Sequence, residues 1–184
     1  MMLPLAALAQ DAPKVEVFGG YSYLHSKGDS SSDGINLNGW NASVAGNLTP
    51  SFGLVADISG HYTTETVVTG LTTTGSGVIT SRAKLSDHLF LFGPRFSYRK
   101  HERVTPFAHV LVGGFRAKGS LSGAFFLNET DTGFAAAAGG GVDVKLSQRF
   151  AFRLVQADYV FDRSNGESGH NARISTGLVF RFGK

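Results

Sequence analysis

The residues of this sequence that could do chemistry are few and widely spaced. The chain contains six histidines and no cysteine. No His-x-His pair or His-Glu-x-x-His motif occurs, so the histidine spacing does not indicate a metal site. The lack of cysteine excludes a thiolate nucleophile. The run Gly139-Gly140-Gly141 is not followed by Lys and Ser or Thr, so it is not a phosphate-binding loop. We therefore predict no catalytic residue, no metal and no cofactor.

Charged residues recur instead at alternate positions within apolar segments, where one face of a strand would collect them. We interpret them as a charge network inside a barrel: Glu16, Asp57, Arg95, Arg99, Asp143, Lys145, Arg153, Asp158, Arg173 and Arg181. An unpaired charge in a narrow interior is destabilising, so each charge should have a partner. Three pairs are expected: Asp143 with Arg153, Asp158 with Arg173, and Arg95 with Asp57. Such pairing predicts a plugged interior, with a narrow ion path as the alternative.

The composition excludes several other classes of protein. The chain has 184 residues, the size of one domain, and a formal net charge of +3. This charge is too small to indicate nucleic-acid binding. With 42% hydrophobic residues the chain is not expected to be disordered. No segment offers ~18 consecutive apolar residues, which excludes membrane-spanning helices, whereas the alternating strands of a membrane barrel remain compatible.

Hydrophobic alternation marks eight segments along the chain. They cover residues 15–25, 37–48, 52–62, 88–99, 105–116, 132–145, 150–160 and 172–182. The connections between them are alternately short and long, which is typical of an up-and-down barrel. We predict an all-β fold, an eight-stranded antiparallel up-and-down transmembrane β-barrel with short periplasmic turns and long external loops. The longest connection, Thr63 to Asp87, is read either as a hairpin extending the barrel wall or as a solvated loop.

The bulky face of these strands is expected outside, because the interior of an eight-stranded barrel only just accommodates packed side chains. In segment 150–160, a bulge near Val155 would turn Arg153, Gln156 and Asp158 inward together. Aromatic residues near the strand ends are predicted to form the girdles at the two membrane interfaces. These residues are Tyr21, Tyr23, Trp40, Phe52, Tyr62, Tyr98, Phe150 and Tyr159.

The first residues have the pattern of a targeting segment. A short apolar run from Leu3 to Leu8 ends in the small-x-small sequence Ala7-Leu8-Ala9, which is typical of a cleavage site. We expect residues 1–9 to be the end of an export signal peptide and residues 10–184 to form one barrel domain.

The last segment carries a more specific motif. Ser175, Gly177, Phe180 and Phe182 match, in order, the pattern polar-x-Gly-x-x-hydrophobic-x-aromatic. In this motif the chain resembles the β-signal of bacterial outer-membrane proteins, and over about residues 13–182 it resembles the OmpA-like small barrels of the porin family. The resemblance implies insertion by the barrel assembly machinery, a location in the bacterial outer membrane and contact with outer-membrane lipid.

We expect a non-enzymatic protein with a structural or surface-interaction role through its external loops, where a surface ligand would bind. A narrow channel for ions or small solutes is the alternative. A lipid A-modifying enzyme would need a polar catalytic group on the outward face near the external rim. A soluble ligand-binding barrel would place the aromatic residues inside. The pattern favours neither of these last two, and we expect a monomer with no nucleic-acid partner.

Overall fold

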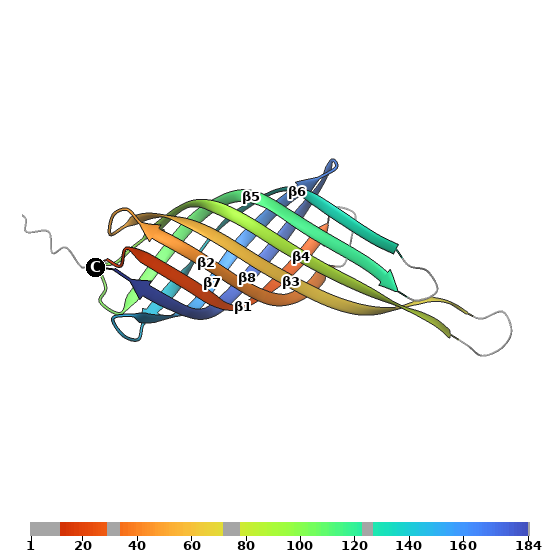
Figure 1. The fold of residues 1–184 in the computed structure, drawn as a ribbon, viewed down its shortest axis with the longest axis horizontal. Helices are drawn as coiled ribbons and strands as arrows, with labels where there is room; N and C mark the ends of the chain where they lie inside the picture. The colour runs from red at the N-terminus through yellow and green to blue at the C-terminus, as the bar shows by residue number, and fades with distance from the viewer. Residues whose placement is uncertain (1–11, 29–33, 72–77, 123–126, 184) are drawn as a thin grey trace, which may run out of the picture.

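A computed structural model describes residues 12–28, 34–71, 78–122 and 127–183, which form eight strands (Figure 1). The expected export signal, residues 1–9, lies outside the described residues. No helix among the described residues is long and apolar enough to cross a membrane. The strands are β1 (Val15–Gly28), β2 (Ile35–Asn47), β3 (Phe52–Leu71), β4 (Val78–Ser97), β5 (Val104–Ser122), β6 (Leu127–Lys145), β7 (Phe150–Ser164) and β8 (Glu167–Phe182).

The strands form one closed sheet. Each pairs antiparallel with the next, and β1 pairs with β8, so the sheet closes into a barrel. The described ends of the chain meet at one end of the barrel, where the Lys14 amide donates to the Gly183 carbonyl at 3.3 Å. Three short turns lie at this same end: β2–β3, β4–β5 and β6–β7. Each joins the end of an even-numbered strand to the start of the next strand, and in an up-and-down barrel those strand ends all lie on the side of the chain termini. The eight-stranded fold predicted from the alternation is confirmed.

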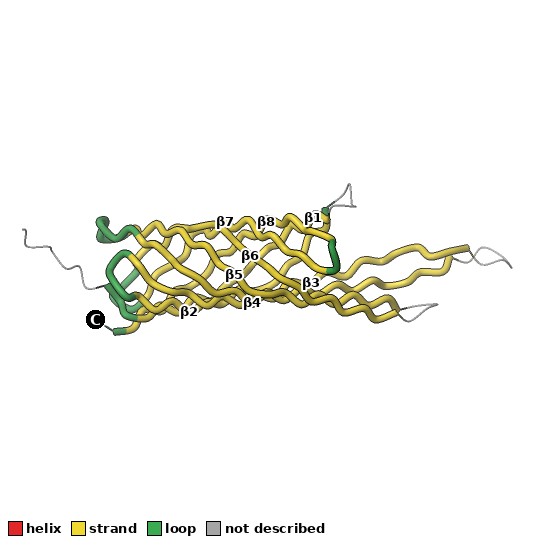
Figure 2. The backbone as a smooth tube through the Cα atoms, turned by 90° about the horizontal axis from the view of Figure 1, so that it is seen from above, coloured by secondary structure: helices red, strands yellow, loops and turns green. Residues whose placement is uncertain are grey.

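At the opposite end, two hairpins continue beyond the barrel. β3 runs to Leu71 and β4 begins at Val78, so the Thr-rich connection is a hairpin that extends the barrel wall. Figure 2 shows the β3–β4 and β5–β6 hairpins projecting past the other strands. Threonine and valine favour extended backbone, which explains why the strands run further than the hydrophobic alternation alone predicts.

The last connection is also shorter than predicted. Instead of a long loop from Phe161 to Asn171, β7 and β8 are joined by a tight turn through Asn165 and Gly166. Their φ angles are 49° and 90°, as a two-residue hairpin turn requires. The adjacent Asn and Gly are the sequence signal for this turn.

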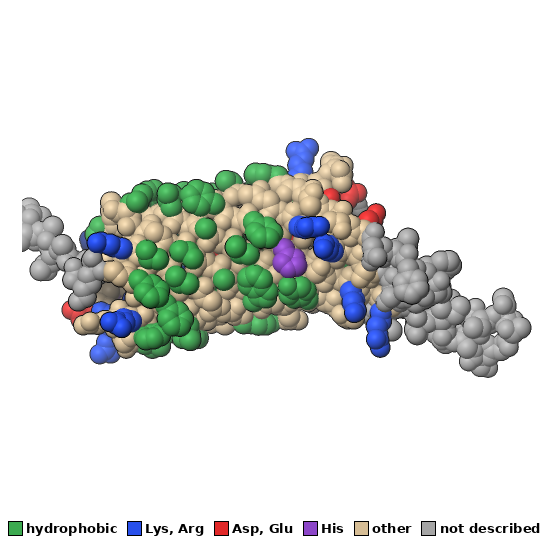
Figure 3. Space-filling view, viewed as in Figure 1, with side chains coloured by type: hydrophobic (Ala, Val, Ile, Leu, Met, Phe, Trp, Pro, Cys, Tyr) green, Lys and Arg blue, Asp and Glu red, His purple; other side chains and the backbone are tan. Residues whose placement is uncertain are grey.

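The outward face of the barrel is apolar. Phe92 on β4 is 53% exposed and Val110 on β5 is 56% exposed. Figure 3 shows hydrophobic side chains over the middle of the barrel, with Lys and Arg gathered towards both ends. An apolar outer band around a polar interior is the arrangement of a membrane barrel, the reverse of a soluble one.

β7 contains the predicted bulge. Asp143 faces Arg153 and Val142 faces Val155, so Leu154 is an extra residue in β7. Leu154 and Val155 both point outward, while Arg153 and the next inward residue of β7 are both buried. The bulge prediction is confirmed. Without the extra residue, strict alternation would turn part of this charged segment towards the apolar surroundings.

Glycine makes room where the interior is most crowded. Gly139 on β6 lies opposite Asp158 on β7, and a Cβ atom at Gly139 would lie 2.2 Å from Asp158 Oδ1. At Gly46 on β2, by contrast, a Cβ atom would meet nothing within 4 Å. The missing side chain at Gly139 therefore allows Asp158 and the backbone of β7 to approach β6 closely.

Substituting Gly139→Ala should lower the free energy of unfolding by about 1–3 kcal/mol, because the added methyl group must displace Asp158. The measurement is urea unfolding of the barrel in detergent micelles, followed by the fluorescence of the single tryptophan, Trp40. The control is Gly46→Ala, which should change stability little. Equal losses in the two variants would contradict this account of Gly139.

Candidate functional site

Glu16 on β1 is a buried carboxylate surrounded by three arginines. Its oxygens lie 2.8 Å from Arg99 Nη2, 3.1 Å from Arg181 Nε and 3.5 Å from Arg95 Nη2. Arg181 lies directly opposite Glu16 on β8. Glu16 therefore ties the seam between the first and last strands to the end of β4.

Asp143 on β6 is a second buried carboxylate, and it contacts two arginines. Its Oδ1 lies 2.8 Å from Arg153 Nε, and its Oδ2 lies 3.2 Å from Arg153 Nη2. Arg95 Nη2 lies 3.3 Å from the same Oδ2. The pair of Asp143 and Arg153 expected from the sequence is therefore present, and Arg95 bridges this carboxylate to Glu16.

Asp158 on β7 belongs to a third group of charged side chains, in which it contacts Arg173 of β8 and His109 of β5. Asp158 Oδ2 lies 2.7 Å from Arg173 Nη2, and Asp158 Oδ1 lies 2.8 Å from His109 Nε2 of β5. The other terminal nitrogen of the Arg173 guanidinium, Nη1, lies 2.8 Å from Asp57 Oδ1 of β3. The expected pair of Asp158 and Arg173 is thus also present, with Asp57 as a further partner.

Neutral side chains join these groups into one continuous network. Arg153 Nη1 donates to Gln156 Oε1 at 2.6 Å, and Gln156 Nε2 donates to Asp158 Oδ2 at 2.8 Å. On β2, Asn41 Nδ2 donates to Asp57 Oδ2 at 2.9 Å. With these links, every one of the eight strands contributes at least one side chain. Each carboxylate of the network accepts a bond from at least one arginine.

Two of the sequence predictions for this network are wrong. Arg95 does not reach Asp57, because the strand register places Arg95 opposite Gly53 and Asp57 opposite Leu91, four residues further along. Lys145 is not part of the network. It is the last residue of β6, and its side chain is exposed at the short-turn mouth of the barrel. Arg99 lies beyond the end of β4 at Ser97, but its long side chain reaches back to Glu16.

Aromatic rings separate the arginines within the interior. The guanidinium of Arg95 lies 4.2 Å from the ring centroid of Phe107, and that of Arg153 lies 4.4 Å from the same centroid. Arg153 also lies 4.2 Å from the ring centroid of Phe18. Cation–π contacts of this kind add to the ion pairs and help two buried arginines to share one carboxylate.

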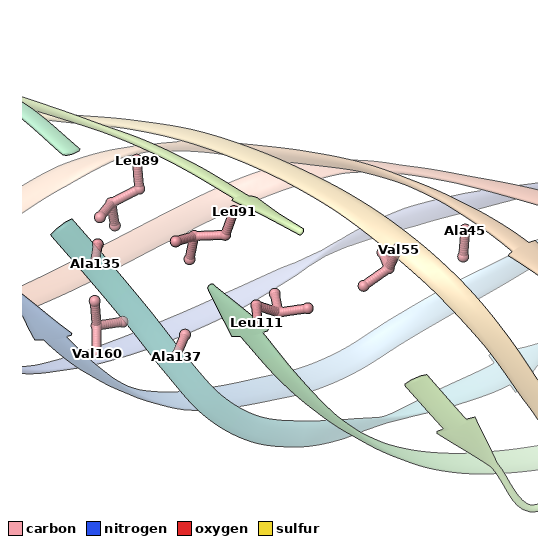
Figure 4. Close-up of a cluster of buried hydrophobic side chains, with 8 residues drawn as sticks. All are labelled: Ala45, Val55, Leu89, Leu91, Leu111, Ala135, Ala137 and Val160. Carbon is pink, nitrogen blue, oxygen red and sulfur yellow. The ribbon is translucent and has the colours of Figure 1, made fainter. Parts of the chain in front are cut away.

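An apolar cluster occupies much of the rest of the interior. Figure 4 shows its side chains, which come from six strands. The cluster consists of Ala45, Val55, Leu89, Leu91, Leu111, Ala135, Ala137 and Val160. Sequence reasoning missed it, although these residues occupy the same alternation phase as the charged ones. The side chains of the charge network and of the cluster are thus buried together in the interior.

The predicted assembly motif lies on β8, beside β1. The Ser175 hydroxyl is buried and lies 2.9 Å from the hydroxyl of Ser22. Gly177 lies opposite Gly20, while Phe180 and Phe182 point outward. Their recognition by the assembly machinery stays a prediction.

The predicted girdle residues point outward at both ends of the apolar band. Phe52, Tyr98 and Phe150 lie beside the short turns, and Tyr21, Tyr23, Trp40, Tyr62 and Tyr159 lie towards the projecting hairpins. Several tyrosine hydroxyls of the second group bond to polar neighbours, as at an interface with water. The Tyr62 hydroxyl lies 3.0 Å from His88 Nε2, and the Tyr159 hydroxyl pairs with His170.

Among the described residues, no group of three His, Asp or Glu side chains is arranged to hold a metal.

Asp143 and Arg153 should be strongly coupled in a double-mutant cycle. Each single substitution, Asp143→Asn or Arg153→Gln, should lower the free energy of unfolding by about 3–5 kcal/mol, because it leaves a buried charge without its partner. The double variant should lose at least about 1 kcal/mol less than the sum of the two. Urea titrations of the four proteins supply the cycle, and additive losses would overturn the assigned pairing.

The chain matches the family described as outer membrane protein beta-barrel domain over residues 1–182. No curated protein sequence matches it. Its structure is similar to Ail, the attachment invasion locus protein of Yersinia pestis, with a TM-score of 0.63, 16% identity, and coverage of 92% of this chain and 99% of Ail. A complex of Ail with the heparin analogue sucrose octasulfate gives a TM-score of 0.61 with the same identity and coverage.

Neisserial surface protein A is a further structural neighbour, with a TM-score of 0.65, 12% identity, and coverage of 92% of this chain and 97% of that protein. At such identities the structural likeness shows the fold alone. The family match covers nearly the whole chain and agrees with the closed eight-stranded barrel. The chain therefore belongs to the outer membrane protein β-barrel domain family, and its place is the bacterial outer membrane.

Proposed function

We propose that this protein is a non-enzymatic surface-interaction protein, whose projecting strands bind an extended segment of another protein. The observation that carries the proposal is the open edge of β3. β3 pairs with β2 only as far as Tyr62, opposite Asn38, whereas its pairing with β4 continues to Leu71. Among the described residues, 63–71 therefore have a neighbouring strand on one side only.

Such an edge has the chemistry of a strand-binding site. The unpaired backbone N–H and C=O groups of an edge strand are a template for another strand, and many recognition domains bind extended peptides in this way. The opposite edge of the projecting sheet is open as well, because β6 pairs with β7 only from Phe134. Ail is named for attachment and invasion and the Neisserial protein for its place on the surface, which agrees with this proposal.

The buried side chains of the interior favour this role over a channel. Arg95, Arg153 and Arg173 are each nearly fully buried and lie in a continuous network. A conducting path would have to break several ion pairs and also wet the apolar cluster around Leu111. We therefore propose that the barrel anchors the projecting strands and carries no current.

Purified protein in a planar lipid bilayer should give no stepwise current, because an ion would have to pass buried ion pairs and the apolar cluster. Arg173→Ala, which removes a large side chain from the middle of the interior, serves as the comparison. Regular current steps from the unsubstituted protein that change size in the Arg173 variant would instead support the channel.

Trimming the β3–β4 hairpin should abolish binding while the barrel stays folded. Thr66 and Arg82 are directly opposite, so an Asn-Gly turn can replace residues 67–81. Cells producing the trimmed protein should lose most of their adhesion to plates coated with serum proteins.

The matched control trims the neighbouring hairpin, where Ser120 lies opposite Asn128, by replacing residues 121–127 with the same turn. This control leaves the β3 edge intact and should keep most of the adhesion. A heat-dependent shift in gel mobility checks that both variants are folded. Equal adhesion of all three proteins would contradict a role for the β3 edge.

A further inference from the structure

Positive charge is in excess in the half of the barrel interior nearer the short turns. The carboxylates of Glu16 and Asp143 are the ion-pair partners of four arginines there: Arg95, Arg99, Arg153 and Arg181. In the other half of the interior the balance is reversed, because one arginine, Arg173, meets the two carboxylates of Asp57 and Asp158. The charges of the network are therefore unevenly distributed along the barrel.

Arginine cannot relieve this excess by losing a proton. A guanidinium group stays protonated in proteins, whereas a crowded or buried carboxylate can take up a proton and become neutral. A buried charge also needs a partner of opposite sign to be tolerated. An excess of arginine is thus a stronger indication of an anion from outside the chain than an excess of carboxylates is of a cation.

The same side chains have bonding capacity left over. Arg181 is only 8% exposed, and its Nε donates to Glu16 Oε1 at 3.1 Å, but its Nη2 has no hydrogen-bond partner. Arg99 Nη1 lies 3.4 Å from the same oxygen of Glu16, so the two guanidinium groups lie on one carboxylate. On β4, Arg95 Nε and the Ser97 hydroxyl are buried and also lack a partner. An acceptor from outside the chain would complete these bonds.

Further cations surround the mouth of the barrel at this end. Lys145 is the last residue of β6, and its amide donates to the Arg103 carbonyl at 2.7 Å, so two exposed like charges lie opposite each other. Like charges in this position repel each other. Glu102 is also exposed in this turn, but it forms no ion pair with another described residue. Figure 3 shows Lys and Arg side chains at this end of the barrel, where they would attract an anion.

We infer that the short-turn mouth of the barrel binds a phosphate-type oxyanion, with Arg181 and Arg99 as its inner donors and Lys145 and Arg103 at the rim. A guanidinium fork matches two oxygens of such an anion, and an ammonium group adds a further donor. These donors come from different strands and turns, so an anion with three or four acceptor oxygens fits them better than a carboxylate with two. The site lies at the opposite end of the barrel from the β3 edge, so neither proposal depends on the other.

In outer-membrane barrels the short turns face the periplasm. A phosphate group can reach this mouth from there either as a free anion or as the head group of an inner-leaflet phospholipid. Both sources offer the same oxygens to the arginines, so the experiment has to distinguish between them.

The test uses the folded, full-length barrel in maltoside micelles and follows the Nε–Hε signals of its arginines by NMR. Inorganic phosphate that replaces chloride at constant ionic strength should shift the signals of Arg181 and Arg99 along a saturable curve, while the Arg173 signal should stay in place. Arg181→Gln should weaken binding at least about tenfold, read from the Arg99 signal, because it removes a charged donor. The rim variant Arg103→Gln/Lys145→Gln should also bind more weakly.

The matched control, Arg116→Gln/Lys118→Gln, removes the same charge from exposed positions of β5 at the other end of the barrel and should bind as the unsubstituted protein does. Gel mobility before and after heating checks that each variant is folded. Phosphatidylglycerol added to the same micelles separates the sources: a response to free phosphate supports a soluble anion, and a response to the lipid alone supports a head group. The inference would be overturned by the absence of a saturable shift with both probes, by an equal response to chloride, or by undiminished binding in both the Arg181 and the rim variants.

Discussion

Burying arginine inside a narrow barrel is the constraint on which the rest of this structure depends. A buried charge without a partner would destabilise the fold by several kcal/mol, so each guanidinium needs a carboxylate at the correct place. Arg95 and Arg173 each meet two carboxylates, and Glu16 meets three arginines. Together with the contacts of Asn41 and His109, this sharing links all eight strands, so the interior is a cross-strand brace that resists slippage of any one strand.

Several local features of the chain serve this interior. The extra residue Leu154 shifts the alternation of β7 so that Arg153 and Asp158 both face inward. Gly139 leaves the space that Asp158 needs, and Phe107 separates two arginines that would otherwise repel each other. The aromatic residues that a small interior cannot hold lie outside, where an apolar membrane favours them. The small volume inside an eight-stranded barrel thus explains both the choice of interior side chains and the aromatic residues on the outer surface.

The molecule has two parts, the closed barrel and the projecting β3–β4 and β5–β6 hairpins. The barrel is braced through its interior, whereas the projecting hairpins extend past the strands that would pair with their edges.

The sequence by itself determined the barrel, the inward phase of the charges and the bulge near Val155, because these features follow from a two-residue period along each strand. It also indicated the pairs Asp143–Arg153 and Asp158–Arg173, since each pair joins neighbouring strands near one connection. Only the tertiary structure decided the partners of Arg95 and the apolar cluster around Leu111. Their contacts cross the interior between strands that are not neighbours, and that geometry depends on strand register and tilt, which residue spacing does not encode.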